Sequence, residues 1–214
     1  MAINLQKGQT INLEKDQYDL SQITIGLGWD VRKAPPQPKG ILGSLFGSKS
    51  EEEEYDLDAV AFLLDEKGKV KNVGAQGLKN GDVVFFNSLK HSSGNIWLTG
   101  DNRTGAGDGD DEQIIVKLNS MSSSVCNILF IVQIYKGHEL KQHFGMVENA
   151  YIRAVDSKGK EMAKYNISGD ATFNNKCSMI FAEVYRKGDG WKFRAIGDPQ
   201  DTDSFVDILK RYMY

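Results

Sequence analysis

An acidic, glycine-rich stretch at residues 100–112 is the part of this sequence best suited to chemistry. It contains five carboxylates and four glycines but one cationic side chain, Arg103. Carboxylates this close repel one another, and glycine loses much backbone entropy on ordering, so the stretch folds at a cost unless a cation joins it. Calcium takes about six to eight oxygens from carboxylates, amides and backbone carbonyls. The composition predicts a calcium site, with a solvated acidic turn as the alternative.

The position of the stretch favours the calcium site. Residues 95–99 before it and residues 113–118 after it are typical of β-strands, whereas disordered acidic tails are seldom found between strands. The stretch is not an EF-hand, since Arg103 or Gln113 would occupy required ligand or glycine positions. A phosphate-binding loop is a poor fit, because there is no Gly-Lys-Ser/Thr and the carboxylates would repel the phosphate.

Size and charge limit the function classes. The chain has 214 residues, 40% hydrophobic and 26% charged, which is ordinary for a globular protein with one large domain or two small ones. Its formal net charge of −3 and pI near 5.7 argue against a nucleic-acid partner. There is no leader-like apolar segment and no apolar run of about 18 residues. We therefore expect a cytoplasmic protein without a transmembrane segment.

Alternation of apolar and polar residues predicts an all-β fold. Residues 128–134 are apolar on both faces and are predicted to form a central strand. Three turns at residues 65–69, 156–160 and 186–190 place glycine where a hairpin needs a positive φ. We predict an antiparallel β-sandwich of about ten strands, with an edge strand within residues 3–13 and a short C-terminal helix. Further strands are expected at residues 23–29, 83–86, 151–155, 179–185 and 191–196.

The C-terminal helix is expected within residues 202–214, capped by Thr202, Asp203 or Ser204. A shorter helical or loop segment is expected at residues 142–149. A surface loop interrupts the strand pattern at about residues 33–55, with three prolines and an acidic run. This loop either folds back as a mobile insertion or presents an apolar knob to a partner or membrane surface. The knob would consist of Ile41, Leu42, Leu45 and Phe46.

No arrangement for covalent catalysis is visible. The sequence lacks Gly-x-Ser-x-Gly and His-Glu-x-x-His, and its three histidines show no metal-binding spacing. Cys126 and Cys177 are far apart and border apolar runs, so we expect buried, reduced thiols. The sequence therefore predicts a protein that is not an enzyme.

Six segments together resemble the TerD-domain family, in the family's order and over about residues 2–198. They are residues 26–30 (GLGWD), 55–64 (YDLDAVAFLL), 84–89 (VFFNSL), 100–112, 149–153 (NAYIR) and 191–197 (WKFRAIG). The resemblance implies a calcium-binding β-sandwich domain, over residues 1–214, from bacterial tellurite resistance and stress response. It also implies partner proteins of a larger assembly at the cytoplasmic side of the membrane. The insertion at residues 33–54 departs from compact members of the family.

The candidate ligands combine the acidic loop with a second acidic pair. Asp56 and Asp58 are spaced i, i+2, which places both carboxylates on one face of a strand and makes them one wall of the site. Asp30 and Asn87 could reach the same end of the sandwich or act as turn caps. Oxygen ligands of this kind favour calcium, as one or two ions, over zinc, copper or magnesium. The remaining candidates are Asp101, Asn102, Thr104, Gly105, Gly107, Asp108, Gly109, Asp110, Asp111 and Glu112.

Three functions remain open at this point. The first is a calcium-dependent binding or scaffold module. The second is a calcium-dependent adaptor at a membrane surface. The third, which the absence of a nameable base disfavours, is a metal-dependent hydrolase.

Overall fold

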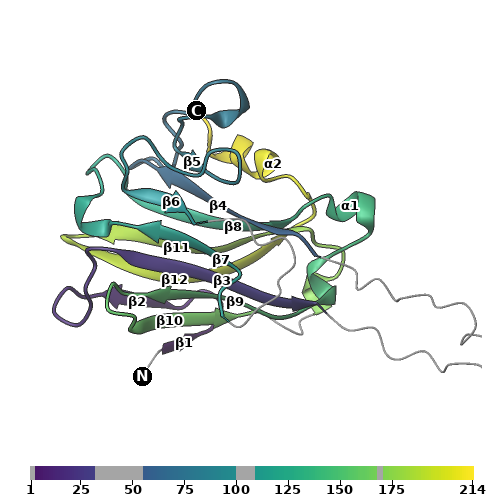
Figure 1. Ribbon diagram of the computed structural model, residues 1–214, viewed down its shortest axis with the longest axis horizontal. Coiled ribbons are helices and arrows are strands. Elements are labelled where there is room, and N and C mark those ends of the chain that lie inside the picture. The colour runs from purple at the N-terminus through teal and green to yellow at the C-terminus, as the bar shows by residue number, and fades with distance from the viewer. Residues whose placement is uncertain (1–2, 32–54, 100–108, 168–170) are drawn as a thin grey trace, which may run out of the picture.

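The part of the chain that the structure describes forms two six-stranded sheets that pack face to face. The computed structural model describes residues 3–31, 55–99, 109–167 and 171–214, and Figure 1 shows the arrangement. Sheet A contains, in spatial order, β1 (Ile3–Leu5), β10 (Glu161–Asn166), β9 (Val147–Val155), β3 (Ile23–Val31), β7 (Glu112–Val116) and β6 (Ile96–Leu98). Sheet B contains β2 (Thr10–Leu13), β12 (Gly190–Gln200), β11 (Ser178–Lys187), β8 (Asn127–Ile134), β4 (Leu57–Leu64) and β5 (Val83–Val84).

Short helices connect and cover the strands. Two are α-helices, α1 (Gly137–Leu140) and α2 (Phe205–Leu209). The 3-10 turns lie at Gln76–Leu78, Leu118–Ser120, Phe144–Met146, Ala171–Phe173 and Lys210–Tyr212. The predicted β-sandwich with a short C-terminal helix is thus confirmed.

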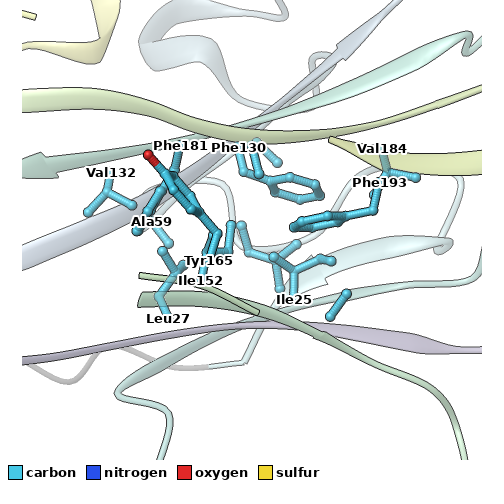
Figure 2. Packing of buried hydrophobic residues seen from close by; sticks show 14 of the residues in the cluster. Ile25, Leu27, Ala59, Phe130, Val132, Ile152, Tyr165, Phe181, Val184 and Phe193 are labelled. Carbon is cyan, nitrogen blue, oxygen red and sulfur yellow. The ribbon is translucent and has the colours of Figure 1, made fainter. Parts of the chain in front are cut away.

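The main core lies between the sheets, because one face of every long strand carries apolar side chains at alternate positions. Ile25, Leu27 and Ile152 of sheet A meet Phe130 and Phe193 of sheet B in this layer, as Figure 2 shows. Tyr165 packs edge-on against Phe181, with ring centroids 5.8 Å apart. This interdigitation fixes the relative position of the two sheets.

A second apolar cluster lies on the outer face of sheet B. Val60 and Phe62 of β4 and Leu129 and Ile131 of β8 pack there against α2 and the segment that follows β4. Because both faces of β8 are covered, its sequence is apolar at nearly every position, which confirms the prediction of a central strand.

The N-terminal segment differs from the single edge strand that we predicted. It forms two strands, and these lie at the edges of different sheets. β1 runs parallel to β10, whereas β2 runs antiparallel to β12. The turn at Gly8, where φ is 82°, lets the chain pass from one sheet to the other.

The three glycine turns have the predicted positive φ at Gly68, Gly159 and Gly188. Two of them close the β9–β10 and β11–β12 hairpins. The turn after Asp65 does not close a hairpin, since its strand β4 pairs with the later strand β5. Turn chemistry predicts a reversal of the chain but does not specify which strand pairs next.

Helix α2 is not capped by its own N-terminal side chains as the sequence suggested. Ser204 occupies the cap position without a side-chain hydrogen bond to the helix. The backbone N–H of Phe205 instead donates to Oε1 of Gln133 at 2.7 Å. The cap is thus supplied by strand β8 beneath the helix.

Two further sequence predictions concern burial and position. Cys177 is buried as predicted, but Cys126 is only half-buried. The predicted surface loop lies outside the described residues except for its last residue, Tyr55, which is buried. The predicted apolar knob also lies outside them, with its residues Ile41, Leu42, Leu45 and Phe46. Among the residues that the structure describes, no helix is long and apolar enough to cross a membrane.

Candidate functional site

The acidic candidates that the structure describes lie at one end of the sandwich. Strand pairing places Glu112 opposite Leu27 in sheet A and Asp58 opposite Gln133 in sheet B. At this end the Glu112 carboxylate of sheet A accepts a hydrogen bond from the backbone N–H of Ala59 in sheet B. The start of β7 and the first half of β4 are therefore neighbours across the two sheets.

Asp111 connects the ends of strands β3 and β7. Its Oδ2 accepts a hydrogen bond from the N–H of Trp29 at 2.9 Å, and its own N–H donates to the carbonyl of Leu27 at 2.7 Å. Burial, followed by the negative charges of Asp30 and Asp110, raises the pKa of the Asp111 carboxyl, although the bond from Trp29 opposes this. The structure therefore holds a carboxyl group where its negative charge is disfavoured.

Glu112 points into the interior between the sheets. It shares its strand face with Ile114, and only 2% of its surface is exposed. Burying a carboxylate is costly unless hydrogen bonds compensate, and the N–H of Ala59 supplies one. Glu112 consequently couples the acidic end to the core.

Asp110 lies on the outer face of sheet A and already has a cationic partner. The Arg153 Nε donates to its Oδ1 at 2.7 Å, and the Tyr151 hydroxyl donates to the same oxygen at 3.0 Å. The carboxyl lies over Gly26, where a Cβ atom would come within 2.1 Å of Asp110 Oδ2. Glycine is required there by this close approach. The hydrogen bond with Asp110 raises the pKa of the Arg153 guanidinium.

Asp58 faces away from Glu112. It shares the outer face of sheet B with Val60, and its Oδ2 accepts a hydrogen bond from Gln133 Nε2 at 2.9 Å. Gln133 therefore links Asp58 to the N-terminus of α2. Asp56 precedes β4, and its backbone carbonyl accepts a bond from the N–H of Tyr135.

Asp30 lies near the end of β3, where its Oδ2 accepts a hydrogen bond from Asn149 Nδ2 at 2.7 Å. Asn87 is exposed in the turn between Phe85 and Ser88. The carbonyl of Gly109 accepts a bond from the Tyr151 hydroxyl at 2.8 Å. The other candidate ligands, Asp101, Asn102, Thr104, Gly105, Gly107 and Asp108, lie outside the described residues.

The described carboxylates do not form a complete metal centre by themselves. Within residues 3–31, 55–99, 109–167 and 171–214, no three His, Cys, Asp or Glu side chains are grouped closely enough to hold an ion. Asp111 fits a hard cation, because a positive neighbour would offset the burial and the negative charges that disfavour its carboxylate. Asp110 fits less well, since Arg153 neutralises it.

Sequence reasoning missed the residues that hold the acids in place. Arg153 and Tyr151 position Asp110, and Gln133 positions Asp58. A signal was present for Gln133, because a polar residue in an otherwise apolar central strand needs a buried partner. No comparable signal pointed to Arg153, because an arginine is ordinary in a strand that has one face exposed to solvent.

Comparison with known proteins gives a consistent result. A family model described as the TerD domain matches residues 1–212. The chain is 57% identical to the tellurium resistance protein TerX of Serratia marcescens over 218 aligned residues, with all of both chains covered. It is 39% identical to the stress response protein SCP2 of Bacillus subtilis (strain 168) over 214 residues, again with all of both chains covered.

A solved structure supports the fold. It is a homologue of telluride resistance protein (TerD), SCO6318 from Streptomyces coelicolor A3(2), with a TM-score of 0.59 and 20% identity. The match covers 87% of this chain and 94% of that chain. The chain therefore belongs to the TerD domain family, which includes tellurium resistance and stress response proteins.

Proposed function

We propose that this protein is a calcium-binding β-sandwich module of the tellurium-resistance and stress-response system, whose acidic end acts as a binding or scaffold surface and carries out no catalysis. The observation that carries the proposal is the buried carboxyl of Asp111, whose negative charge is disfavoured by burial and by the charges of Asp30 and Asp110, while Arg153 is paired with Asp110. A second cation would relieve the remaining repulsion.

Asp111 and Asp30 would hold the ion together with oxygen ligands from residues 101–108 of the adjoining loop, which include Asp101 and Asp108. Asp110 would stay with Arg153 and orient the start of β7. The bound ion would supply positive charge and would rigidify the loop, whose glycines make it costly to order. Oxygen ligands select calcium over zinc, and magnesium retains its waters too strongly for a crowded protein site.

A rigid, neutralised loop would form a surface for another protein of the same stress system. Affinity capture from stressed cells, with and without calcium, tests this part of the proposal. Co-sedimentation with anionic liposomes is the accompanying measurement. Calcium-dependent recovery with liposomes, but not with proteins, would replace the scaffold role by that of a membrane-surface adaptor.

Thermal unfolding tests the ion itself. A ligand that binds only the folded state at a hundredfold excess over its Kd adds about 2.7 kcal/mol, or roughly 5–10 °C in Tm for a chain of this size. We expect chelator to lower the Tm and calcium to restore it, while zinc and magnesium at equal concentration do not. Identical melting curves under all four conditions would refute the calcium assignment.

A further inference from the structure

Three polar side chains form a hydrogen-bonded row at the other end of strand β4, away from the acidic site. Nε2 of His91 lies 3.0 Å from Oδ1 of Asp82, and Nδ1 of His91 lies 2.8 Å from Oγ of Ser93. The histidine and aspartate side chains are 12% and 22% exposed, whereas Ser93 is exposed to solvent. The row has the order orienting acid, base and hydroxyl nucleophile that acyl-transfer enzymes use on unrelated folds.

The hydrogen bonds assign the protonation state of the imidazole. The backbone N–H of Ser93 donates to Nδ1 of His91 at 3.1 Å, and an amide N–H can only donate. Nδ1 is therefore the acceptor, so the neutral ring carries its proton on Nε2 and donates it to Asp82. In this tautomer Nδ1 accepts from both the backbone N–H and the hydroxyl of Ser93, and the hydroxyl, at 2.8 Å, is the closer donor and the one that can give up its proton.

The two ends of the row are fixed by backbone groups. Oδ2 of Asp82 accepts a hydrogen bond from the N–H of Asn72 at 2.9 Å, so the carboxylate keeps its orientation. Oγ of Ser93 accepts a bond from the N–H of Asn95 at 3.2 Å. Because Nδ1 of His91 carries no proton, the Ser93 hydroxyl is the donor in its 2.8 Å contact with Nδ1. A base held by an oriented acid, next to a hydroxyl, is the arrangement that activates a serine.

A cavity of about 90 Å³ adjoins the row and gives it room for a substrate. His91 and Ser93 line it together with the apolar side chains of Met121 and Val125. Residues with donor groups, Lys71, Ser122 and Ser124, also line it, as do the carboxylate-bearing Asp65 and Asp82. This volume suits a short acyl group, and the donors suit the negative oxygen that forms when a carbonyl is attacked.

We propose that Ser93 is an activated nucleophile, with His91 as its base and Asp82 as the positioning residue, and that the site hydrolyses esters with short acyl groups. Ser93 Oγ forms a bond to the ester carbonyl carbon while its proton moves to Nδ1 of His91. The bond to the alcohol oxygen then breaks, and the alcohol leaves with that proton. Water, deprotonated by His91, releases the carboxylic acid and restores Ser93. No oxidant, metal or other co-reactant is needed.

The test uses the full chain with a fluorophosphonate probe, followed by peptide mapping and by measurement of p-nitrophenyl acetate hydrolysis. We expect the probe to label Ser93, and Ser93→Ala to abolish both labelling and the hydrolysis above background. His91→Gln should slow labelling by about a hundredfold or more, the usual contribution of a general base. The neighbouring Ser92→Ala is the matched control and should label at the wild-type rate.

Ser93 is exposed, so Ser93→Ala is expected to fold normally, and its Tm is compared with that of Ser92→Ala. Absence of label on the wild-type protein, or equal labelling of the Ser93→Ala variant, would overturn the proposal. Hydrolysis unchanged in His91→Gln would also overturn it, because the hydrogen bonds would then only stabilise the turn. The outcome is independent of calcium, so failure here leaves the proposed metal function unaffected.

Discussion

Glu112 of sheet A accepts a hydrogen bond from the backbone N–H of Ala59 in sheet B, across the interior of the sandwich. The contact joins the acidic end to the packing of the core, because Glu112 adjoins Asp111 in the chain and Ala59 packs between the sheets. Events at the acidic end should therefore be visible in the stability of the whole domain. The predictions that follow use this connection.

Replacing Asp111 by asparagine should have opposite effects with and without calcium. The amide oxygen can still accept the bond from Trp29, while the disfavoured negative charge is removed. In chelator, we expect the Tm of Asp111→Asn to exceed that of the wild type by a few degrees. The rise in Tm on adding calcium should be at most half as large for the variant as for the wild type. Scanning calorimetry in both buffers measures the two effects.

The matched control for this variant is Asp189→Asn. Asp189 is exposed in the β11–β12 turn at the opposite end of the sandwich. Asp189→Asn should change the Tm measured in chelator by no more than about 2 °C, as is usual for exposed sites. The rise in Tm on adding calcium should change by no more than the same amount. A lower Tm for Asp111→Asn in chelator would contradict the interpretation that its charge is disfavoured.

The same carboxyl predicts a pH dependence of stability in chelator. The pKa of Asp111 is raised on folding, so between 3.8 and the raised value the folded state binds more protons than the unfolded state. The contribution of Asp111 to the free energy of unfolding therefore falls as pH rises through this interval. Several other carboxyls, including Asp156, have lowered pKa values and act in the opposite sense.

Comparing variants isolates this contribution. The difference in unfolding free energy between Asp111→Asn and the wild type should increase with pH above 3.8 and then level off. Urea titrations at closely spaced pH values provide the measurement. A difference that stays flat with pH would show that the Asp111 pKa is the same in both states.

The close approach of Asp110 to strand β3 predicts that alanine is not tolerated at Gly26. The new Cβ would lie 2.1 Å from Asp110 Oδ2, and Asp110 cannot move without breaking its ion pair with Arg153. Overpacking of this kind costs about 1–3 kcal/mol. Urea denaturation of Gly26→Ala should show this loss. Gly190→Ala is the control, since its nearest contact would be at 3.9 Å, and equal stability of the two variants would argue against the steric account.

The buried thiol of Cys177 should be inert in the folded protein. Burial is the main factor that raises the pKa of this thiol to about 11, and its Sγ donates a hydrogen bond to the carbonyl of Gln142. In a Cys126→Ser background, Ellman's reagent at pH 8 should react with Cys177 only as fast as the protein unfolds. Addition of urea should release the full reaction. Rapid stoichiometric reaction of the native variant would instead indicate an accessible thiolate able to reduce oxyanions.

Local sequence patterns predicted correctly those features that depend on residues close together in the chain. The positive φ at Gly159 and Gly188, the alternation along β3 and the doubly apolar β8 follow from steric limits and from burial on one face or both. The N-terminal strand was predicted wrongly, because a turn at Gly8 sends its halves to different sheets. That choice depends on free edges far away in the chain.

Sequence spacing predicted which acidic residues lie at one end of the sandwich but not how they are used. Alternation along a strand separates side chains onto two faces, yet it does not specify which face receives a helix or another sheet. Asp58 was expected to face the acidic loop, and the structure directs it to Gln133 beneath α2. Asp110 was expected to be a ligand, and Arg153, 43 residues away, holds it on the outer face of sheet A.

The sequence by itself determined the β-sandwich, the acidic composition of the loop and the resemblance to the TerD-domain family, because periodicity, glycine turns and motif order are all properties of consecutive residues. The tertiary structure alone decided the partners of each carboxylate and the meeting of Asp82 with the His91–Ser93 turn. These contacts join segments separated along the chain, and they form only once the packing of the two sheets has fixed where each strand ends.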